Sequence, residues 1–280
     1  MVSKKEINID ATTVAGFGDE WSRFNQNGLN LDARAQIFDD YFSIFPWGAL
    51  SKNATGIDIG CGSGRWAAVV APRVGQLLLL DASSDALAVA RHNLVNVPNV
   101  RFEQASVGSL PLEDASLDFA YSLGVLHHVP DTAAAIRSIS EKLKSGAPFL
   151  VYLYYSFDNR GVMYRGIWKA SDMVRRLVSR MPFGLRYFAS QVFALMVYWP
   201  LARVALLLDR IGVCPDGWPL AYYKDKPFYV LRTDALDRFG TRLEHRFSRA
   251  EIRSMLEEAG FTDIRFSDKP PYWCAVGIKS

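Results

Sequence analysis

The feature that most constrains the fold of this chain is a regular alternation of short apolar runs and helical patterns over residues 54–154. The apolar runs lie at 54–59, 76–80, 100–103, 117–121 and 149–154, and helical patterns occupy 65–71, 84–93 and 132–143. Strands that alternate with helices pair in parallel, because each helix returns the chain across one face of the sheet. The sequence therefore predicts an α/β fold built on a doubly wound, mostly parallel sheet.

The alternation stops after Tyr154 and resumes at Ser248, which suits the N-cap of a helix at 249–258. Two more strand-like runs, at 262–267 and 273–278, bring the predicted sheet to seven strands and resemble a closing antiparallel hairpin. The chain then has three parts, which are an N-terminal helical lid (1–50), an α/β core (51–155 and 247–280) and a helical cap insertion rich in arginine and aromatic residues (156–246).

Charge is unevenly distributed, although the 32 Lys and Arg residues exceed the 29 Asp and Glu residues by only three. Residues 151–250 contain 16 basic and 8 acidic residues, a sum of +8, and 13 of the basic residues are arginines. Arginine in excess of lysine favours structured contacts with anions over a diffuse patch for nucleic acid. We expect a small-molecule partner and no nucleic acid.

One segment of the insertion, residues 187–208, is long enough to span a bilayer, and 18 of its 22 residues are apolar or aromatic. Pro200 lies inside it, and a proline in a helix interior removes a hydrogen bond and clashes with the preceding turn. The pattern predicts one or two buried helices, broken near Pro200. Peripheral contact with a membrane and a homodimer through the cap helices are the alternatives.

The three cysteines, Cys61, Cys214 and Cys274, are far apart and have no CxxC or Cys/His spacing. This pattern argues against a disulfide framework and a zinc site, so we expect no metal. The first ten residues contain lysines with no apolar run after them, so no secretory signal is expected. These observations favour a cytoplasmic location.

The densest motif is Gly60-Cys61-Gly62-Ser63-Gly64, directly after the apolar run 54–59. Glycines at alternate positions let the backbone turn tightly and approach a ligand without an intervening Cβ. The spacing is GxGxG and not the GxGxxG of dinucleotide-binding enzymes, which favours a ligand without a pyrophosphate. Asp81 stands 23 residues after Asp58 at the end of the second run, where a carboxylate can accept both hydroxyls of a ribose.

Together these residues resemble the class I S-adenosylmethionine-dependent methyltransferases, over about 54–154 and again from 248 onwards. Two further stretches carry the resemblance. Residues 110–114, LPLED, are similar to the family's LPF-x-D, and residues 126–131, LHHVPD, are similar to its LHH-x-x-D. The resemblance implies a Rossmann-like fold, S-adenosylmethionine as cofactor, S-adenosylhomocysteine as product and methyl transfer to a small molecule.

The resemblance also assigns cofactor-binding residues to the glycine loop, to the ends of the second to fourth strands and to the lid: Asp58, Gly60, Gly62, Gly64, Asp81, Ala82, Ser106, Val107, Leu123 and Trp21. The glycine loop would lie beside the methionine part, and Asp81 would bind the ribose. Ser106 stands where the family usually has an acidic residue for the adenine amine, so a hydroxyl or main-chain contact is expected there. Trp21 would belong to an aromatic lid with Phe17 and Phe24, or simply pack on the sheet.

Methyl transfer from a sulfonium is an in-line displacement, so the site must hold the acceptor atom behind the carbon–sulfur bond. A neutral hydroxyl acceptor also needs a base, whereas an unprotonated amine, a thiolate or an enolate does not. His127 and His128 are the candidate bases, because they follow the fourth strand, where the methyl group should emerge. Asp131 is expected to be the N-cap of the helix at 132–143.

Candidate substrate-binding side chains follow the fifth strand or precede the return of the core: Tyr154, Tyr155, Asp158, Arg160, Arg242 and His245. Arginines there can hold a carboxylate or phosphate bidentately, although a solvated face with internal salt bridges is the alternative. Three functions stay open. They are methylation of a small molecule with an anionic group and an apolar part, methylation of a lipid-like or prenyl acceptor at a membrane surface, and a non-catalytic cofactor-binding or interaction module.

Overall fold

The computed structural model describes residues 8–24, 31–214 and 218–280. The chain divides into two compact units. Unit 1 comprises residues 1–26, 35–156 and 243–280, and unit 2 comprises residues 27–34 and 157–242. The long inserted segment thus forms most of a unit of its own, bounded by Ser156 and Leu243.

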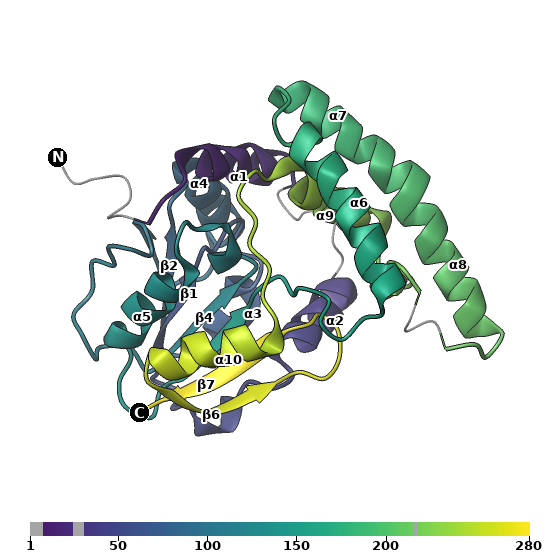
Figure 1. Cartoon of the computed structure of the whole chain (residues 1–280). Helices are drawn as coiled ribbons and strands as arrows, with labels where there is room; N and C mark the ends of the chain where they lie inside the picture. Colours follow the sequence, from purple (N-terminus) through teal and green to yellow (C-terminus); the bar gives the residue numbers. More distant parts are fainter. Residues whose placement is uncertain (1–7, 25–30, 215–217) are drawn as a thin grey trace. The chain divides into compact units, whose positions relative to one another are not determined.

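Within the described residues, unit 1 contains a seven-stranded sheet in the order β3-β2-β1-β4-β5-β7-β6 (Figure 1). The strands are β1 (Thr55–Ile59), β2 (Gln76–Asp81), β3 (Val100–Gln104), β4 (Phe119–Leu123), β5 (Pro148–Tyr152), β6 (Phe261–Phe266) and β7 (Cys274–Lys279). β1 to β5 pair in parallel, and β7 runs antiparallel between β5 and β6. The predicted doubly wound sheet is confirmed. Its winding reverses between β1 and β4, whose carboxyl ends form the switch point where open α/β sheets bind ligands.

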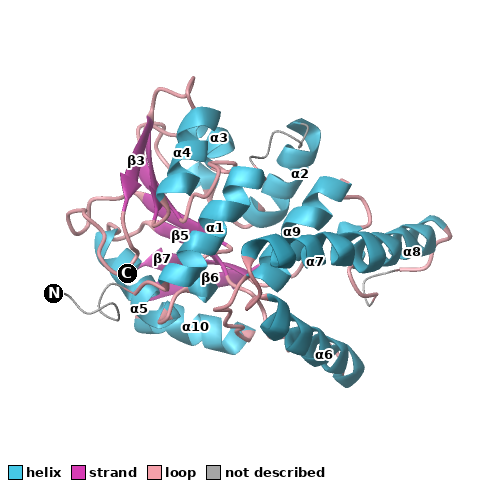
Figure 2. Cartoon of the chain, turned by 90° about the horizontal axis from the view of Figure 1, so that it is seen from above, coloured by secondary structure: helices cyan, strands magenta, loops and turns pink. Residues whose placement is uncertain are grey.

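Helices cover both faces of this sheet. α5 (Thr132–Lys142) and α10 (Arg249–Glu258) lie on one face, and α3 (Ala67–Val70) and α4 (Ser84–Asn93) lie on the other (Figure 2). Asp131 caps α5 through the Ala134 N–H, and Ser248 forms a capping box with Glu251 at α10. Both predicted N-caps are confirmed.

The remaining elements before β5 include two helices and three 3-10 turns: α1 (Ala11–Arg23), α2 (Leu31–Phe42), η1 (Trp47–Ala49), η2 (Ala71–Arg73) and η3 (Leu126–His128). The strand β4 is buried at all five positions, because it lies in the middle of the sheet. It begins at Phe119, two residues later than predicted, since Leu117 forms only an isolated bridge to Leu143. A uniformly apolar run gives no alternation from which to read the first paired residue.

Unit 2 is helical, and its described residues contain no strand. Its elements are α6 (Val162–Val178), α7 (Phe183–Phe193), the π-helical turn η4 (Ala194–Tyr198), α8 (Trp199–Arg210), η5 (Ala221–Tyr223) and α9 (Phe228–Gly240). α6 and α7 both pack against α9.

The predicted break near Pro200 is wrong. α7, η4 and α8 form one uninterrupted helical segment, Phe183–Arg210, and Pro200 lies in the first turn of α8. An α-helix interior cannot easily accept proline, because the ring displaces the hydrogen bond to the carbonyl four residues earlier. The π turn immediately before Pro200 replaces that bonding pattern with wider hydrogen-bonded rings, so the segment continues through the proline.

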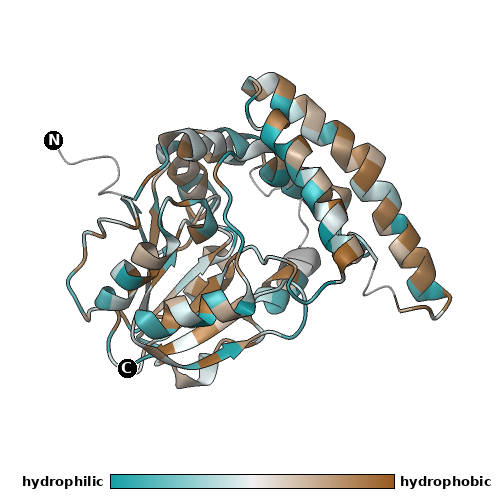
Figure 3. Ribbon diagram, in the orientation of Figure 1, coloured by the Kyte–Doolittle hydropathy of each residue, from teal (hydrophilic) through white to brown (hydrophobic). Residues whose placement is uncertain are grey.

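The prediction that this segment is buried is also wrong. Phe183–Arg210 is long and apolar enough to cross a membrane by length and composition, yet only 22% of its most apolar window is buried. Phe188 and Met196 are each 67% exposed. The buried row of the same helix consists of small and polar residues: Arg186, Ser190, Ala194, Tyr198, Ala202 and Ala205. The segment therefore leaves many of its bulky apolar side chains exposed. The hydropathy colours show hydrophobic residues recurring along α7 and α8 (Figure 3).

Unit 2 also buries charge, at the contact between α6 and the end of α9. Asp172 accepts hydrogen bonds from Arg175 Nε at 2.7 Å and from Arg176 Nε at 2.9 Å. Arg175 in turn donates to the main-chain carbonyls of Thr241 and Arg242. Burial raises the pKa of Asp172, but the Arg175 hydrogen bond and the nearby guanidinium charges outweigh this and hold it below its ordinary value. These contacts hold α6 against the chain that leaves α9.

Candidate active site

The loop after β1 has a backbone that only glycine adopts easily. Gly60, Gly62 and Gly64 have φ angles of +73°, +53° and +76°. A Cβ added to Gly60 would lie 2.4 Å from Val125 Cγ1, and one added to Gly62 would lie 2.8 Å from Trp21 Cε2. The three glycines thus let the loop pass close to its neighbours where a Cβ would clash.

Asp81 lies at the end of β2 and joins it to the glycine loop. Its Oδ2 accepts a hydrogen bond from the Gly62 N–H at 2.9 Å, and its Oδ1 accepts one from the Ser83 N–H at 2.8 Å. Burial raises the pKa of Asp81, although the hydrogen bonds from Ser83 and Gly62 oppose this. The neighbouring Ala82 uses its carbonyl to accept from Gln104 Nε2 at 3.3 Å. The carboxylate is therefore fixed beside the loop that the resemblance assigns to the cofactor.

Asp58 on β1 is buried and paired with a residue that the sequence analysis did not identify. Tyr121 is its register partner on β4, and the Tyr121 hydroxyl donates to Asp58 Oδ2 at 2.9 Å. Burial raises the pKa of Asp58 to about 7, although the Tyr121 hydrogen bond lowers it. The sequence contains no signal for this pair, because the register between β1 and β4 depends on how the strands align in the sheet.

Helix α1 contacts the loops that follow three of the strands. Trp21 lies against Gly62 after β1, and a Cβ on Gly18 would lie 2.9 Å from Ser83 Oγ after β2. The Phe17 ring is 5.0 Å from the His128 ring, which follows β4. The Arg65 guanidinium lies 5.8 Å from the Trp21 ring centroid. α1 thus spans the carboxyl ends of β1, β2 and β4, where the resemblance places the cofactor.

The other cofactor candidates follow β3 and end β4. Ser106 is buried, and its Oγ accepts from the Gly108 N–H at 3.1 Å. The Val107 side chain belongs to the apolar core, so its main chain is the part that a ligand can reach. Leu123 is the last residue of β4 and is 7% exposed.

His127 and His128 are both buried in η3, with ring centroids 4.0 Å apart, but their hydrogen bonds differ. His128 Nδ1 lies 2.7 Å from the Leu243 carbonyl, which can only accept, so Nδ1 carries the proton and Nε2 has the lone pair. His127 Nδ1 accepts from the Tyr154 N–H at 3.4 Å, which places the His127 proton on Nε2. Burial, followed by the charges of His128, Arg246 and His245, lowers the pKa of His127 well below its ordinary value.

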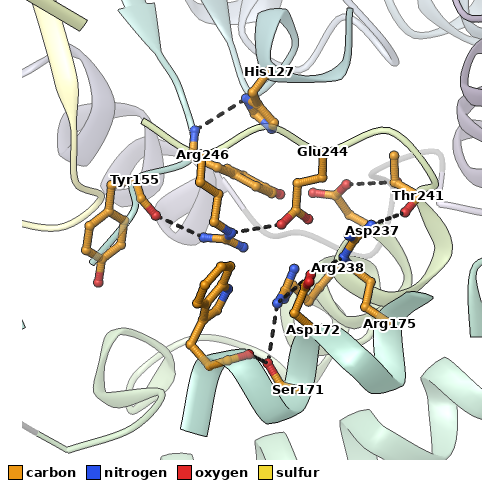
Figure 4. A network of polar contacts seen from close by, with 12 residues as sticks. His127, Tyr155, Ser171, Asp172, Arg175, Asp237, Arg238, Thr241, Glu244 and Arg246 are labelled. Atoms are coloured by element: carbon orange, nitrogen blue, oxygen red, sulfur yellow. Dashed lines mark hydrogen bonds and ion pairs between the residues drawn. The ribbon is translucent and has the colours of Figure 1, made fainter. Parts of the chain in front are cut away.

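Three of the six substrate-binding candidates lie near these histidines in unit 1. The Tyr154 ring stacks on His127 with centroids 3.8 Å apart, and the His245 N–H donates to the His127 carbonyl at 2.9 Å. The Tyr155 carbonyl accepts from Arg246 Nη1 at 3.2 Å (Figure 4). Tyr154, Tyr155 and His245 are thus brought together by β5 and the returning chain at 243–247.

Arg246 and Glu244 form an ion pair beside these residues. Neither of them is among the predicted site residues. Arg246 Nε donates to Glu244 Oε1 at 2.8 Å, and the Glu244 side chain is 1% exposed. The Arg246 guanidinium also lies 5.0 Å from the Tyr154 ring centroid. The dense run of charges at 242–246 was the available signal, but sequence does not show which of these side chains turn inward.

The other three candidates, Asp158, Arg160 and Arg242, lie in unit 2. Asp158 is exposed, and the Arg160 guanidinium lies 5.3 Å from the Tyr164 ring centroid. Arg242 is exposed, and its Nε donates to the Ser179 carbonyl at 3.1 Å. Within this unit they take part in local contacts of the cap. The described residues contain no group of three or more His, Cys, Asp or Glu side chains placed to hold a metal ion.

Comparison with known proteins gives the site a context. Residues 57–151 match the profile of a family described as "Methyltransferase domain". An uncharacterized methyltransferase of Bacillus subtilis, YcgJ, is 33% identical over 102 residues, which cover 36% of this chain and 40% of the relative. Trans-aconitate 2-methyltransferase of Deinococcus radiodurans is 29% identical over 182 residues, 65% of each chain. The chain thus spans less than two thirds of the length of these relatives.

A solved structure shares the fold over nearly the whole chain. It is a SAM-dependent methyltransferase from Thermotoga maritima, which aligns with a TM-score of 0.51 and 15% identity over 94% of this chain and 100% of that one. At this identity the similarity concerns the fold, and it agrees with the strand order and the helices of unit 1.

Proposed function

Because this chain belongs to the class I S-adenosylmethionine-dependent methyltransferase family, we propose that it transfers a methyl group to a small-molecule acceptor with an anionic group and an apolar part. The observation that carries the proposal is the pairing of the glycine loop with Asp81 at the sheet's switch point. When bound, S-adenosylmethionine supplies a methyl group attached to a positively charged sulfur.

The residues present fit this cofactor. Glycines with positive φ give the loop its tight turn beside Asp81, and Asp81 offers carboxylate lone pairs beyond the two used by main-chain N–H groups. The Ser63 hydroxyl in the same loop is buried and has no hydrogen-bond partner among the described residues, so it retains capacity for a polar ligand. Asp81 would hold the ribose, the glycine loop would hold the methionine part, and Trp21 would exclude water.

The two histidines would have different roles toward the acceptor. His128 Nε2 carries the lone pair and would take the proton of a hydroxyl acceptor, because its Nδ1 proton is held by the Leu243 carbonyl. His127 Nε2 carries a proton, and burial keeps the ring neutral, so His127 would donate a hydrogen bond rather than act as a base. We therefore assign His128, and not His127, as the general base.

Two observations support an anionic group on the acceptor, namely the positive charge of Arg246 and the similarity to one relative. Arg246 lies beside Tyr154 and Tyr155 at the end of β5, and a carboxylate or phosphate would bind its guanidinium alongside the Glu244 carboxylate. The Deinococcus relative is named for trans-aconitate, which is an anion. The rings of Tyr154 and Tyr155 supply apolar surface for the rest of the molecule.

Calorimetry with S-adenosylmethionine tests the cofactor assignment. We expect binding by the native protein and affinity weaker by at least about 100-fold for Asp81→Ala, because two charge-assisted hydrogen bonds are lost. Asp85→Ala, which removes an exposed carboxylate of the same loop–helix region, is the matched control. Absence of binding by the native protein, or equal binding by Asp81→Ala, would refute the proposal.

A panel of acceptors tests the chemistry. Formation of S-adenosylhomocysteine is measured with amphiphilic carboxylates and phosphates and with their neutral alcohol analogues. We expect turnover of the anions, and with a hydroxyl acceptor we expect His128→Gln to lose far more activity than His127→Gln. Preference for the neutral analogues would overturn the acceptor class. Binding of S-adenosylmethionine without turnover of any acceptor would favour the non-catalytic module.

A lipid-like or prenyl acceptor is the second candidate, and a specific observation favours it. Exposed bulky side chains such as Phe188 and Met196 on unit 2 form a surface suited to a membrane, where such an acceptor would reside. Vesicles carrying a prenylated or acylated hydroxyl compound, compared with its water-soluble analogue, separate the two candidates.

A further inference from the structure

Unit 2 exposes two rows of bulky apolar side chains. The row on α7 and α8 contains Phe188, Val192, Leu195, Trp199 and Leu207, which are 67%, 40%, 54%, 44% and 58% exposed. The row on α6 contains Met163, Ile167, Val174 and Leu177, which are between 39% and 81% exposed. We call these two rows the outer face. Side chains at three- and four-residue spacing lie along one side of a helix, so each row is a continuous stripe.

The outer face is not simply the surface left over after a core has formed. In an ordinary surface helix the apolar stripe packs inward and polar residues meet water. The long segment Phe183–Arg210 instead packs inward with polar and small side chains such as Arg186, Ser190 and Ala194, and leaves bulky apolar side chains exposed along its other side. Apolar patches of this kind on soluble proteins usually mark a place where another phase or partner binds.

The charges around the outer face are almost all basic. Residues 162–210 contain eight Arg or Lys and two acidic residues. Of these acids, Asp172 is buried under Arg175, and Asp209 is paired with Lys224 at 2.8 Å. Arg165, Lys169 and Arg176 run along the exposed side of α6, about a third of a turn from its apolar row, and the exposed Arg180 follows the end of the helix.

We propose that the outer face of unit 2 binds the surface of an anionic lipid bilayer. The apolar rows would enter the boundary between headgroups and acyl chains, and the basic row of α6 would lie against the anionic headgroups. Arg and Lys suit this position, since their long stems lie along apolar surface while their charges reach the headgroups. Trp199 adds an aromatic ring of the type enriched at membrane interfaces.

A second copy of the chain is a less suitable partner for this face. A two-fold symmetric contact through α6 would bring its basic row close to the same row of the other copy. Like charges that face each other across an interface oppose association, and the exposed side of α6 offers no acidic residue to offset them. An anionic bilayer supplies the missing opposite charge.

A membrane-spanning role for Phe183–Arg210 is also disfavoured. The inward row of this helix includes the buried guanidinium of Arg186, which donates to the Gly240 carbonyl at 2.9 Å. Its neighbour α9 contains Arg232, whose Nη2 donates to the Tyr187 hydroxyl at 3.0 Å, and also carries Asp234, Asp237 and Arg238. A spanning helix would carry these charges into the hydrocarbon, whereas a helix lying in the interface immerses only its outer row.

Vesicle cosedimentation of the full chain tests the proposal. The probes are vesicles of phosphatidylcholine alone and of phosphatidylcholine mixed with phosphatidylglycerol. We expect binding to the anionic vesicles that weakens as salt is raised, and little binding to the neutral ones. Lack of binding to anionic vesicles, or equal binding to both at every salt concentration, would overturn the proposal.

Two pairs of substitutions locate the surface. Phe188→Ser with Leu195→Ser, and separately Arg165→Glu with Lys169→Glu, should each weaken vesicle binding by about tenfold or more. The matched controls are Val95→Ser, which changes a 77% exposed apolar residue of unit 1, and Lys52→Glu with Arg101→Glu, which changes exposed charges of unit 1. Circular dichroism and S-adenosylmethionine titration confirm that each variant is folded.

The remaining outcomes each contradict the proposal in a recognisable way. Equal loss of binding in the control variants would show that the outer face is not the binding surface. Resistance to alkaline carbonate extraction would indicate a spanning helix. A dimer in sedimentation equilibrium that dissociates in the Phe188→Ser, Leu195→Ser variant, without vesicle binding by the native chain, would identify a second copy as the partner. None of these outcomes bears on methyl transfer, which is tested separately.

Discussion

The two units differ in the side chains that they bury and expose. In unit 1, Ile57, Phe119 and Phe149 are fully buried, and the polar residues of the candidate site gather where the strands end. In unit 2, Asp172, Arg175 and Arg186 are buried, while Phe188 and Met196 are mostly exposed.

This difference indicates what each unit is adapted to contact. An apolar core with polar groups at one edge of a sheet suits a site for a polar ligand. Unit 2 adds buried ion pairs and main-chain hydrogen bonds to a small apolar core, and it leaves further apolar rows outside, for contact with something other than water. If this difference holds, the stability of unit 2 depends on its buried charges and that of unit 1 on its backbone geometry and its buried carboxylate.

The largest effect is expected from Asp172→Ala in unit 2. The change leaves Arg175 buried without its carboxylate and should lower the free energy of unfolding of this unit by about 4 kcal/mol. Hydrogen exchange of amides in α6 and α9 measures the loss. Asp209→Ala breaks a more exposed ion pair with Lys224 and should cost less than about 1 kcal/mol. Equal effects of the two substitutions would remove the contrast between buried and exposed charge.

In unit 1, Asp58 should make stability depend on pH. Its pKa is raised to about 7 in the folded chain and returns to its ordinary value on unfolding, so the protonated form favours folding. The stabilisation is complete below about pH 4 and is lost progressively as the pH rises from there to 7, by roughly 4 kcal/mol. Denaturation at a series of pH values should show this decline in the native protein, and a smaller decline in Asp58→Asn. Identical pH profiles would show that Asp58 is not buried as described.

Gly62→Ala tests the backbone of the glycine loop. The added Cβ meets the Trp21 ring and forces a non-glycine residue to φ +53°, so we expect a loss of about 1–2 kcal/mol in stability, with weaker binding of S-adenosylmethionine. Gly48→Ala is the control, because its Cβ would meet nothing within 4 Å and its φ is not positive. Chemical denaturation and calorimetry report the two effects. If both variants behave alike, the loop tolerates a side chain and the geometric argument fails.

The smallest effect concerns the capping box of α10. Ser248→Ala removes the hydroxyl that accepts from the Glu251 N–H and should lower stability by about 1 kcal/mol. Ser145→Ala, in an exposed turn of the same unit, should change it by a few tenths at most. Thermal unfolding of the three proteins measures the difference. A change that matches the control would mean that other contacts hold the start of α10.

Much of unit 1 could be predicted because its signals are local. Strand and helix limits follow from apolar runs and turn residues, and the glycine loop and Asp81 sit at fixed places in that alternation. The N-caps at Asp131 and Ser248 are read from the residue and its position. The Asp58–Tyr121 pair could not be predicted in this way, because it joins residues 63 positions apart through the strand register.

The errors in unit 2 have a physical cause. An apolar segment of 22 residues has the same composition whether it lies in a protein core or against a membrane. The composition of residues 187–208 therefore predicts an interior position although the segment is exposed. Which side of a helix is buried depends on its neighbours. Here α9, which carries Arg232, packs against α7, and this contact buries the row of small and polar side chains on α7. The prediction of a break at Pro200 is wrong for a related reason. A π turn can accommodate a proline when packing against neighbouring helices holds the segment in place.

The sequence by itself determined the α/β class, the order of its elements and the glycine loop after the first strand, because these depend on periodicity and on backbone conformation. Only the tertiary structure decided which nitrogen of each histidine carries a proton, which carboxylate meets which tyrosine, and which face of the long helix is exposed. Those features depend on partners distant in the chain, such as Leu243 for His128 and Gly240 for Arg186. Hydrogen bonds and burial are properties of neighbours in space, and the order of residues does not specify them one at a time.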